Sequence, residues 1–537
     1  MKIKEHTFDR AGLMERMRKA HAPESRSKFG GDVLLIALAT VSDELDVPQQ
    51  VQIRRHKRQM ILDRGLPAYP VSLPITASIA QLREQYGHLD AEVSTGVIVG
   101  IAGRVIFSRN AGKLAFATIA AGSGETVQAM VSLSHIGEES LADWKALVDL
   151  GDHIFVRGEI ITSKRGELSV LADSWSMASK SLRPLPVAHK DMNEESRVRQ
   201  RYVDLIMRPE AQVMARIRVK TVSALRTSLS NREYLEIETP MLQTQPGGAT
   251  ARPFVTRSNA FGIDLYLRIA PELFLKRAVV GGFDRVFEIN RNFRNEGADS
   301  THSPEFAMLE FYQAFADYQD MATITRELIQ ESAQTVAGSM TVVHFDGSEH
   351  DLSGIWPQLD LYSSLSKVVG QEVAPGTSRT VLESLCAAAD ITFAPTWVDG
   401  KLVEELFEHH VIPTFTGPTF VMHFPVDTSP LTRDHRSRAG VVEKWDLYVN
   451  GFELATGYSE LVDPVIQRER LVEQASLGAQ GDAEAMPLDE DFLRALEYGM
   501  PPSGGVGMGV DRLLMALTGH GIRETILFPL VKPERDQ

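Results

Sequence analysis

The first third of the chain alternates apolar and polar residues with the two-residue period of β-strands. The runs predicted as strands are Val97–Val99, Gly103–Phe107, Leu114–Ile119, Val127–Val131, His153–Gly158 and Gly166–Val170. Between the fourth and the fifth of these runs, Leu141 to Val148 has helical spacing instead. This region, from Gly96 to about Pro184, is therefore predicted to be an all-β unit with one helix.

Five or six short strands with one helix are typical of a small Greek-key barrel of the oligonucleotide-binding (OB) type. We expect Arg104, Phe116 and Gln128 on its strand face. There Phe116 would stack on a base and Gln128 would bond a base edge. Taken alone, Phe116 is more often a core residue, because apolar aromatic side chains in barrels usually point inward. The pattern predicts the barrel and leaves the role of Phe116 open.

A basic segment precedes the barrel. Val51, Ile61 and Leu62 would give a helix one apolar edge, and residues 54–58 (RRHKR) make the remainder cationic. Such a helix could clamp nucleic-acid phosphates, although a solvated helix face explains it equally well. Residues 1–46 show no sustained period and are interpreted as an extension of unknown role. The first folded unit is thus expected to span residues 47–186.

A larger second unit is predicted over residues 187–537, after the linker Pro184–Pro186. Helical spacing from Ala215 to Leu229 precedes a predicted half-buried strand from Tyr234, which Pro240 closes. Further alternating runs are Val286–Ile289, Ala307–Tyr312, Pro418–Val421, Trp445–Val449, Phe452–Glu460 and Gly505–Arg512. Residues 361–410 are interpreted as a helical insertion. Antiparallel-style strands flanked by helices predict an α+β unit.

Length and composition narrow the class of protein. A chain of 537 residues is too long for one core and predicts two or more domains. The single cysteine, Cys386, excludes an intrachain disulfide and a cysteine-ligated zinc site, which suits a reducing cytoplasm. The apolar run Val33–Val41 is far shorter than the roughly 20 residues that span a bilayer, so no membrane association is expected. The formal charge of -15 argues against indiscriminate nucleic-acid binding but permits local basic surfaces.

The densest group of chemically active side chains lies in residues 291–310, between two predicted strands. On a strand–loop–strand hairpin, its arginine, aromatic and carboxylate side chains would reach over a ligand. A lone surface ion pair between Arg294 and Glu296 would contribute only about 0–1 kcal/mol. That interpretation does not account for Phe306 and Glu310 at the start of an apolar return strand. The block predicts a site for an anionic nucleotide beside a cationic substrate.

Three segments resemble the three signature motifs of the class II aminoacyl-tRNA synthetases: the strand ending at Pro240, the loop bearing Arg294 and the glycine-rich strand-to-helix element bearing Arg512. Within the class, residues 293–306 and 270–273 (APEL) are similar to bacterial lysyl-tRNA synthetases. The resemblance covers residues 48–533. It implies a class II antiparallel-sheet catalytic domain after an OB-fold barrel that reads the anticodon of lysine tRNA. It also implies a cytoplasmic homodimer whose interface includes the Pro240 region.

The carboxylates favour a lysine substrate independently. A substrate ammonium loses its hydration in a closed pocket and must meet fixed anions, each worth about 4 kcal/mol at an effective dielectric near 20 before desolvation. By resemblance, Glu310 and Glu460 lie near the side-chain amine of L-lysine, while Glu272 and the Gly248 backbone meet its α-amino group. All the residues that the resemblance places around lysine are Gly248, Glu272, Glu310, Tyr312, Thr456, Tyr458 and Glu460. A cation pocket of this kind would reject neutral isosteres strongly.

The resemblance also implies an ATP site. Its residues are Arg294, Glu296, His302, Phe306, Glu453 and Arg512. Arg294 would bind the α-phosphate, Glu296 the adenine amino group, and Phe306 and Arg512 opposite faces of the adenine. Asp446 and Glu453 match the family's Mg²⁺ ligands. The implied chemistry needs no side-chain nucleophile, because the lysine carboxylate attacks the α-phosphorus and the tRNA ribose then attacks the adenylate.

Two positions depart from the commonest family pattern. Thr456 stands where many relatives have asparagine, and Asp446 where many have glutamate. Three alternative assignments share parts of this pattern. Aspartyl and asparaginyl synthetases would carry cations where Glu310 and Glu460 lie. A lysyl-transferring lipid-modifying enzyme would carry several transmembrane helices. A catalytically silent paralogue is disfavoured because the nucleotide residues, from Arg294 to Arg512, are retained together.

Overall fold

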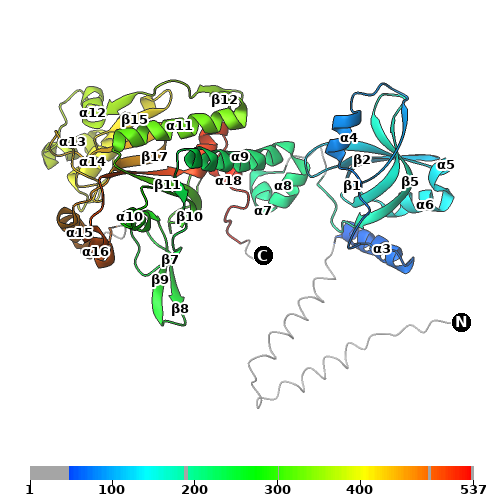
Figure 1. The fold of residues 1–537 in the computed structure, drawn as a ribbon, viewed down its shortest axis with the longest axis horizontal. Coiled ribbons are helices and arrows are strands. Elements are labelled where there is room, and N and C mark those ends of the chain that lie inside the picture. Colours follow the sequence, from blue (N-terminus) through cyan, green and yellow to red (C-terminus); the bar gives the residue numbers. More distant parts are fainter. Residues whose placement is uncertain (1–47, 187–191, 300, 482–484, 534–537) are drawn as a thin grey trace, which may run out of the picture. The chain divides into compact units, whose positions relative to one another are not determined.

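The computed structural model describes residues 48–186, 192–299, 301–481 and 485–533, and these form two units, one on each side of residues 187–191 (Figure 1). The extension predicted for residues 1–46 and the boundary predicted near residue 187 lie outside the described residues. Each unit has a hydrophobic core of its own. The two units are therefore described separately.

The first unit is a closed five-stranded barrel with strand order β1-β2-β3-β5-β4, which confirms the predicted OB-type barrel. Its strands are β1 Ser94–Ala111, β2 Leu114–Ala120, β3 Thr126–Ser132, β4 His153–Thr162 and β5 Leu168–Ser179. Its helices are α3 Gln49–Asp63, α4 Ile79–Tyr86, α5 Leu133–Ile136 and α6 Glu138–Leu147. Alternate residues of β2, such as Ala115, Ala117 and Ile119, fill the barrel interior.

The prediction of two strands at residues 97–99 and 103–107 was wrong, because β1 runs through both of them without a break. Gly100 and Gly103 are not turn residues. A Cβ at Gly100 would lie 2.6 Å from the Pro74 carbonyl oxygen, and a Cβ at Gly103 would lie 2.6 Å from the Ala120 carbonyl oxygen. The glycines therefore permit close backbone approach within a continuous strand.

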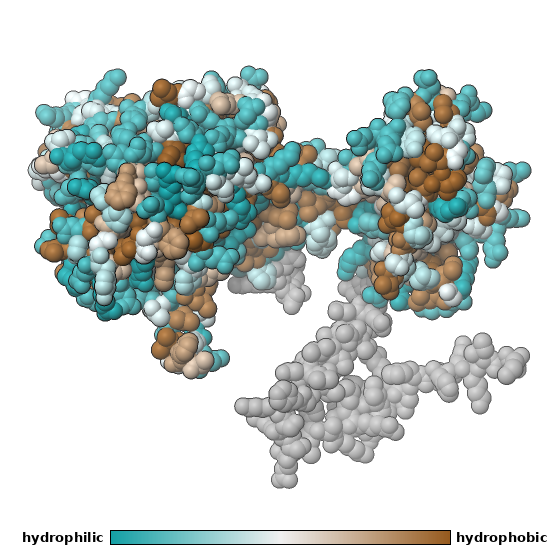
Figure 2. All heavy atoms as spheres, in the orientation of Figure 1, coloured by the Kyte–Doolittle hydropathy of each residue, from teal (hydrophilic) through white to brown (hydrophobic). Residues whose placement is uncertain are grey.

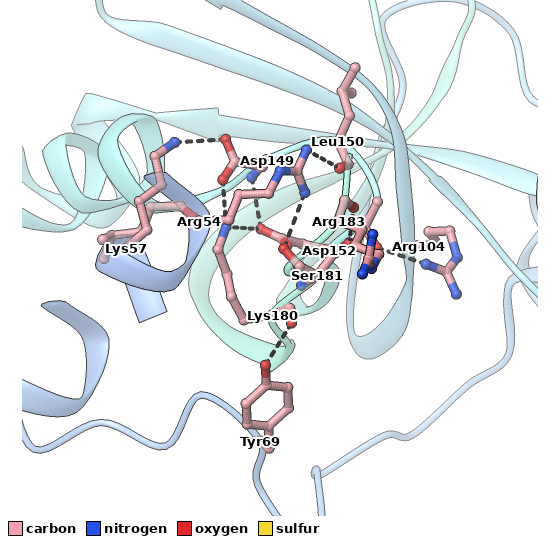
Figure 3. A network of polar contacts seen from close by, with 12 residues as sticks. Arg54, Lys57, Tyr69, Arg104, Asp149, Leu150, Asp152, Lys180, Ser181 and Arg183 are labelled. Carbon is pink, nitrogen blue, oxygen red and sulfur yellow. Dashed lines mark hydrogen bonds and ion pairs between the residues drawn. The ribbon is translucent and has the colours of Figure 1, made fainter. Parts of the chain in front are cut away.

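Helix α3 uses part of its predicted basic surface to dock on the barrel. Arg54 is buried, and its guanidinium donates to the carbonyl oxygens of Leu150, at 2.9 Å, and Ser181, at 3.2 Å (Figure 3). Lys57 pairs with Asp149 at 2.6 Å. The helix was predicted to bury Leu62, but Leu62 is 38% exposed. Neither of the two interpretations left open for this helix, a phosphate clamp or a solvated face, describes Arg54 and Lys57, because both side chains bind the barrel.

A buried lysine anchors the chain where it leaves the barrel. The ammonium of Lys180 lies 2.6 Å from Asp149 and 2.8 Å from Asp152, and it donates to the Leu147 carbonyl oxygen at 2.7 Å (Figure 3). Lys180 and Asp152 are both fully shielded from solvent. Because a buried charge is tolerated only when it is paired and hydrogen-bonded, this network fixes the segment after β5 against the barrel.

The second unit is built on an eight-stranded sheet of order β14-β15-β16-β17-β18-β11-β10-β6, which confirms the predicted α+β unit of mainly antiparallel strands (Figure 1). The pairings are antiparallel except at the two edges, where β14–β15 and β6–β10 are parallel. The strands are β6 Leu235–Glu236, β10 Arg285–Phe293, β11 Glu305–Ala314, β14 Gln358–Asp360, β15 Thr419–Met422, β16 Lys444–Val449, β17 Phe452–Ser459 and β18 Ser503–Gly509. Two small sheets contain β7 Leu242–Gln243, β8 Val255–Ser258 and β9 Ile263–Leu267, and β12 Thr341–Val343 and β13 Glu349–Asp351.

Helices cover this sheet. They are α7 Glu194–Arg199, α8 Arg201–Met207, α9 Pro209–Asn231, α10 Glu272–Val280, α11 Tyr318–Ala337, α12 Leu361–Val369, α13 Arg379–Ala388, α14 Asp399–His410, η1 Ile412–Thr414, α15 Pro464–Ala479, α16 Glu490–Glu497, α17 Val510–Thr518 and α18 Ile522–Thr525. α9, α11 and α17 share the main core with the central strands. Residues 361–410, predicted as a helical insertion, contain α12, α13 and α14.

The strand predicted from Tyr234 to Thr239 is only two residues long in the structure. Only Leu235 and Glu236 pair with β10, and both side chains are exposed, so the half-buried alternation expected there was wrong. The cause is its place at the sheet edge, where one neighbour is missing and Pro240 removes a backbone donor.

The pleat of β11 places the site on one face of the sheet. Leu309 and Phe311 point into the main core, so the alternate residues Glu310 and Tyr312 point to the opposite face. In register, Glu310 lies beside Glu288 on one neighbouring strand and beside Gly507 on the other. Carboxylates are therefore gathered on this face by strand periodicity alone.

Candidate active site

A cavity of about 360 Å³ lies over β11, β17 and β18. Of the residues predicted for the site, those that line it are Gly248, Glu272, Arg294, Glu296, His302, Phe306, Glu310, Tyr312, Glu453, Thr456, Tyr458 and Arg512. Asp446 and Glu460, also predicted for the site, are buried beside the cavity and do not line it. Residues scattered over more than 260 positions of the chain thus converge on one cavity.

Arg294 follows β10 in the hairpin loop, and its guanidinium lies 5.2 Å from the centroid of the Phe306 ring. Its backbone N–H donates to the Pro304 carbonyl oxygen at 2.9 Å, which closes the loop across the hairpin. Burial lowers the pKa of Arg294, while the charges of Glu296, Glu453 and Glu310 oppose that shift. Its Nε has no hydrogen-bond partner among the described residues. A half-buried cation with free donor capacity is suited to an anion.

A second cation faces the same half of the cavity. Arg512 begins the helix after β18 and donates through Nη1 to the Glu453 carbonyl oxygen at 2.7 Å. Its Nη2 lies 3.3 Å from Nε2 of His302. The preceding residue, Asp511, accepts a hydrogen bond from the Ala307 N–H at 2.7 Å and forms an ion pair with Arg218. Asp511 therefore ties the Arg512 element to β11, a role that the sequence did not indicate.

The other half of the cavity is acidic. Glu272 and Glu310 are buried on its wall, and the Tyr312 hydroxyl lies 3.3 Å from Glu310 Oε2. Burial raises the pKa of Glu310 well above its usual range, and the charges of Glu272 and Glu288 raise it further. An arriving ammonium would reverse this shift, because it stabilises the ionised carboxylate.

Gly248 approaches Glu272 closely. It has φ +84, and a Cβ there would lie 2.9 Å from the Glu272 Cβ. Gly505 lies similarly close to Glu460, where a Cβ would be 2.1 Å from the Glu460 Oε1. These two glycines thus make room for carboxylates rather than only for packing.

Lys276 and Arg268 were missed as parts of the site. Lys276 Nζ lies 2.7 Å from Glu272 and 2.5 Å from Glu460. Arg268 pairs with Glu288 at 2.7 Å behind Glu310. The four-residue spacing of Glu272 and Lys276 was a usable signal, since such residues share one helix face. No signal in the sequence indicated Arg268.

The predicted metal ligands lie on paired strands. Asp446 of β16 has Lys444 Nζ at 3.2 Å from one carboxylate oxygen, and the other, Oδ1, has no hydrogen-bond partner in the described part of the chain. Burial raises the pKa of Asp446 to about 6, with the Lys444 charge opposing it and Glu453 adding to it. Among the described residues, no three His, Cys, Asp or Glu side chains gather as a metal site. Two carboxylates with one free oxygen fit Mg²⁺, which is usually bound by one or two carboxylates together with substrate phosphates.

On the barrel, Phe116 and Gln128 point outward, because their neighbours along β2 and β3 fill the interior. Phe116 is therefore not a core residue. The Gln128 side-chain oxygen accepts a hydrogen bond from Ser169 at 3.1 Å. Arg104 lies on the same outer face and donates to the Gly151 carbonyl oxygen at 2.8 Å. The Phe116 side chain is thus partly exposed on the outer face of the barrel.

Comparison with known proteins gives two family matches. Residues 193–532 match the family described as tRNA synthetases class II (D, K and N), and residues 99–178 match the OB-fold nucleic acid binding domain. Proteins named lysine–tRNA ligase from Kineococcus radiotolerans and Mycolicibacterium gilvum are 63% and 62% identical over 489 residues, which cover 91% of this chain and 98% of each relative. A lysylphosphatidylglycerol biosynthesis bifunctional protein from Mycobacterium avium is 48% identical over 91% of this chain but over only 41% of its own length.

Proposed function

We propose that this chain, which belongs to the class II tRNA synthetases of the D, K and N group, is an ATP-dependent ligase that joins L-lysine to its tRNA through a lysyl-adenylate. One observation carries the choice of substrate. Glu272 and Glu310 lie on the wall of the same cavity as Arg294 and Arg512, so anions for an amino acid's ammonium groups stand beside cations for a nucleotide's phosphates.

The roles proposed for the acidic half follow from charge. Glu310 meets the side-chain ammonium of lysine, and Glu272 with the Gly248 backbone meets the α-ammonium. Tyr312 and Tyr458 flank the aliphatic stem, since both rings line the cavity. Glu460 acts from behind the wall through its contact with Lys276. Thr456, which lines the cavity where many relatives have asparagine, adds a hydroxyl at the same place.

The basic half is proposed to bind ATP. Arg294 contacts the α-phosphate, Glu296 accepts from the adenine amino group, and Phe306 stacks on the adenine. Arg512 stabilises the leaving pyrophosphate. Its guanidinium is held by the hydrogen bond to the Glu453 carbonyl oxygen and lies near His302. Held in line with the α-phosphorus, the lysine carboxylate attacks it directly, and the chain supplies orientation and charge rather than a nucleophile.

Asp446 and Glu453 would hold Mg²⁺, whose chemistry is to neutralise charge on the phosphates when bound. The free Oδ1 of Asp446 supports this assignment. The barrel is proposed to bind the anticodon of lysine tRNA through Arg104, Phe116 and Gln128, because these residues share its outer face. A flat aromatic ring on an open sheet face is a stacking platform for an unpaired base.

A homodimer in the cytoplasm is proposed from the family and from exposed apolar side chains around Pro240. Leu235, Met241 and Leu242 are 52%, 47% and 51% exposed. In Figure 2 the nearby projecting β8–β9 hairpin shows apolar residues beside polar ones, and it carries Phe261, which is 79% exposed. Exposed apolar surface of this kind marks association sites.

The helices of the described residues include none with the length and apolar character of a membrane span.

An aminoacylation assay tests this function. The full chain, given ATP, Mg²⁺ and unfractionated bacterial tRNA, is expected to charge the tRNA with radiolabelled lysine. Aspartate and asparagine, the substrates of the related synthetases, are expected to give no charging, because Glu310 would repel the side-chain carboxylate of aspartate and would be left unpaired by the neutral side-chain amide of asparagine. Charging with either of these amino acids, or failure with lysine, would refute the proposal.

A further inference from the structure

A lysine of the protein itself lies among the carboxylates of the acidic half. Lys276 of α10 is fully buried, with its ammonium 2.7 Å from Glu272 and 2.5 Å from Glu460. The same ammonium lies 5.6 Å from the centroid of the Tyr458 ring. A buried ammonium is costly unless it is paired, so two anions hold this one in place.

The buried charges around Lys276 do not balance. Glu272, Glu310 and Glu460 bring three negative charges when ionised, and Lys276 supplies one positive charge. Glu288, which lies beside Glu310, is already neutralised by its ion pair with Arg268. Lys276 therefore offsets one of the three carboxylate charges, and two negative charges are left. A lysine substrate brings two ammonium groups, which neutralise these two charges.

We propose that Lys276 is a positioning residue for lysine selection. It holds Glu272 and Glu460 in place, and it leaves the cavity with a net negative charge that the two ammonium groups of a lysine substrate neutralise. This inference rests on the proposed lysine ligase function. Lys276 does not line the cavity, so it acts through the two glutamates and does not touch the substrate.

The surroundings of Lys276 keep it charged. Burial acts to lower its pKa, but the charges of Glu272 and Glu460 outweigh burial and raise it. The titratable groups that face this cluster from packed elements are Glu310 and Tyr312 of β11, Glu288 of β10, and Tyr458 of β17. From α16 the neighbour is Phe492, whose ring centroid lies 6.0 Å from the ammonium and carries no charge. Burial raises the pKa of Glu310 and of Glu460, so these two carboxyls are the groups of the cluster that titrate closest to neutral pH.

The test uses three variants of the full chain in lysine-dependent pyrophosphate exchange. Lys276→Met is expected to lower kcat/KM for lysine about 100-fold while leaving the KM for ATP close to that of the wild type. The acid limb of its pH profile is expected to move up by about one pH unit, because carboxylates without a counter-cation take up protons more readily. Lys276→Arg is expected to retain the wild-type limb. The control is Lys401→Met, which breaks another (i, i+4) lysine–glutamate pair, with Glu405 on α14, and should change nothing.

A double variant covers the case in which Lys276→Met does not fold. Lys276→Met with Glu460→Gln removes both charges of the buried pair, a change that folded proteins often tolerate. Its kcat/KM for lysine is also expected to fall while its KM for ATP stays near the wild-type value, because Glu272 loses the cation that holds it in place. An unchanged kcat/KM for lysine in the folded variants, with an active wild type, overturns the role of Lys276 alone. A wild type driven by another amino acid overturns the proposed function and this inference together.

Discussion

Replacing Arg294 with alanine is expected to lower lysine-dependent pyrophosphate exchange by at least about 10³-fold, the scale of losing a preorganised cation from a charged transition state. Arg294 is half-buried beside the Phe306 ring and has unused donor capacity in the cavity. Negative charge develops on the α-phosphoryl oxygens as the lysine carboxylate attacks, so this guanidinium contributes most in the transition state. The loss should therefore appear in kcat as well as in KM for ATP.

The control for Arg294→Ala is Arg494→Ala, which removes an exposed arginine paired with Asp491 on α16. Its exchange rate should equal that of the wild type. Binding of tRNA, measured separately by filter retention, should be nearly unchanged in Arg294→Ala, because the proposed anticodon surface lies in the other unit. An Arg294→Ala enzyme with normal exchange would contradict the placement of the α-phosphate.

Replacing Glu310 with glutamine is expected to lower kcat/KM for lysine by roughly 10²- to 10⁴-fold, since leaving a buried charge without its partner costs about 3–5 kcal/mol. The amide keeps the volume of the side chain and removes only its charge. The KM for ATP should stay near the wild-type value. Glu305→Gln, at the exposed start of the same strand, is the matched control.

The pH dependence of this effect has a definite sign. Burial, Glu272 and Glu288 raise the pKa of Glu310, so the free enzyme holds this carboxyl protonated at pH values where an ordinary glutamate is ionised. Lysine needs the ionised form, and kcat/KM for lysine should rise as pH rises through that raised pKa. Glu310→Gln should lose this rise. A profile that falls over the same range in the wild type would contradict the role of Glu310.

Features set by local periodicity were predictable from the sequence. The hairpin of β10 and β11 follows from alternation on each side of a polar loop, and the same alternation places Glu310 opposite the core residues Leu309 and Phe311. The barrel strands were found in the same way. The break predicted between residues 99 and 103 was wrong, because the chain continues through Gly100 and Gly103 as one strand in which both glycines permit close backbone approach.

Features set by distant partners were not predictable. Arg54 is buried because it reaches a carbonyl oxygen 96 residues away, and nothing in a basic helix indicates such a partner. Lys276 has one partner at helical spacing, but its second, Glu460, comes from the end of β17. Likewise, Glu460 was expected to face the substrate directly, and its pairing with Lys276 depends on how α10 packs beside the sheet. Local pattern gives the carboxylates, whereas their counter-ions come from the tertiary fold.

The most direct measurement of the central claim is pyrophosphate exchange by the wild-type enzyme with lysine and with norleucine, which has a similar chain but lacks the side-chain amine. We expect robust exchange with lysine and a kcat/KM for norleucine lower by about 10⁴-fold, because buried carboxylates would be left unpaired. Comparable exchange with the two amino acids would show that the glutamates of the cavity do not select a cation, and would contradict the proposed lysine pocket.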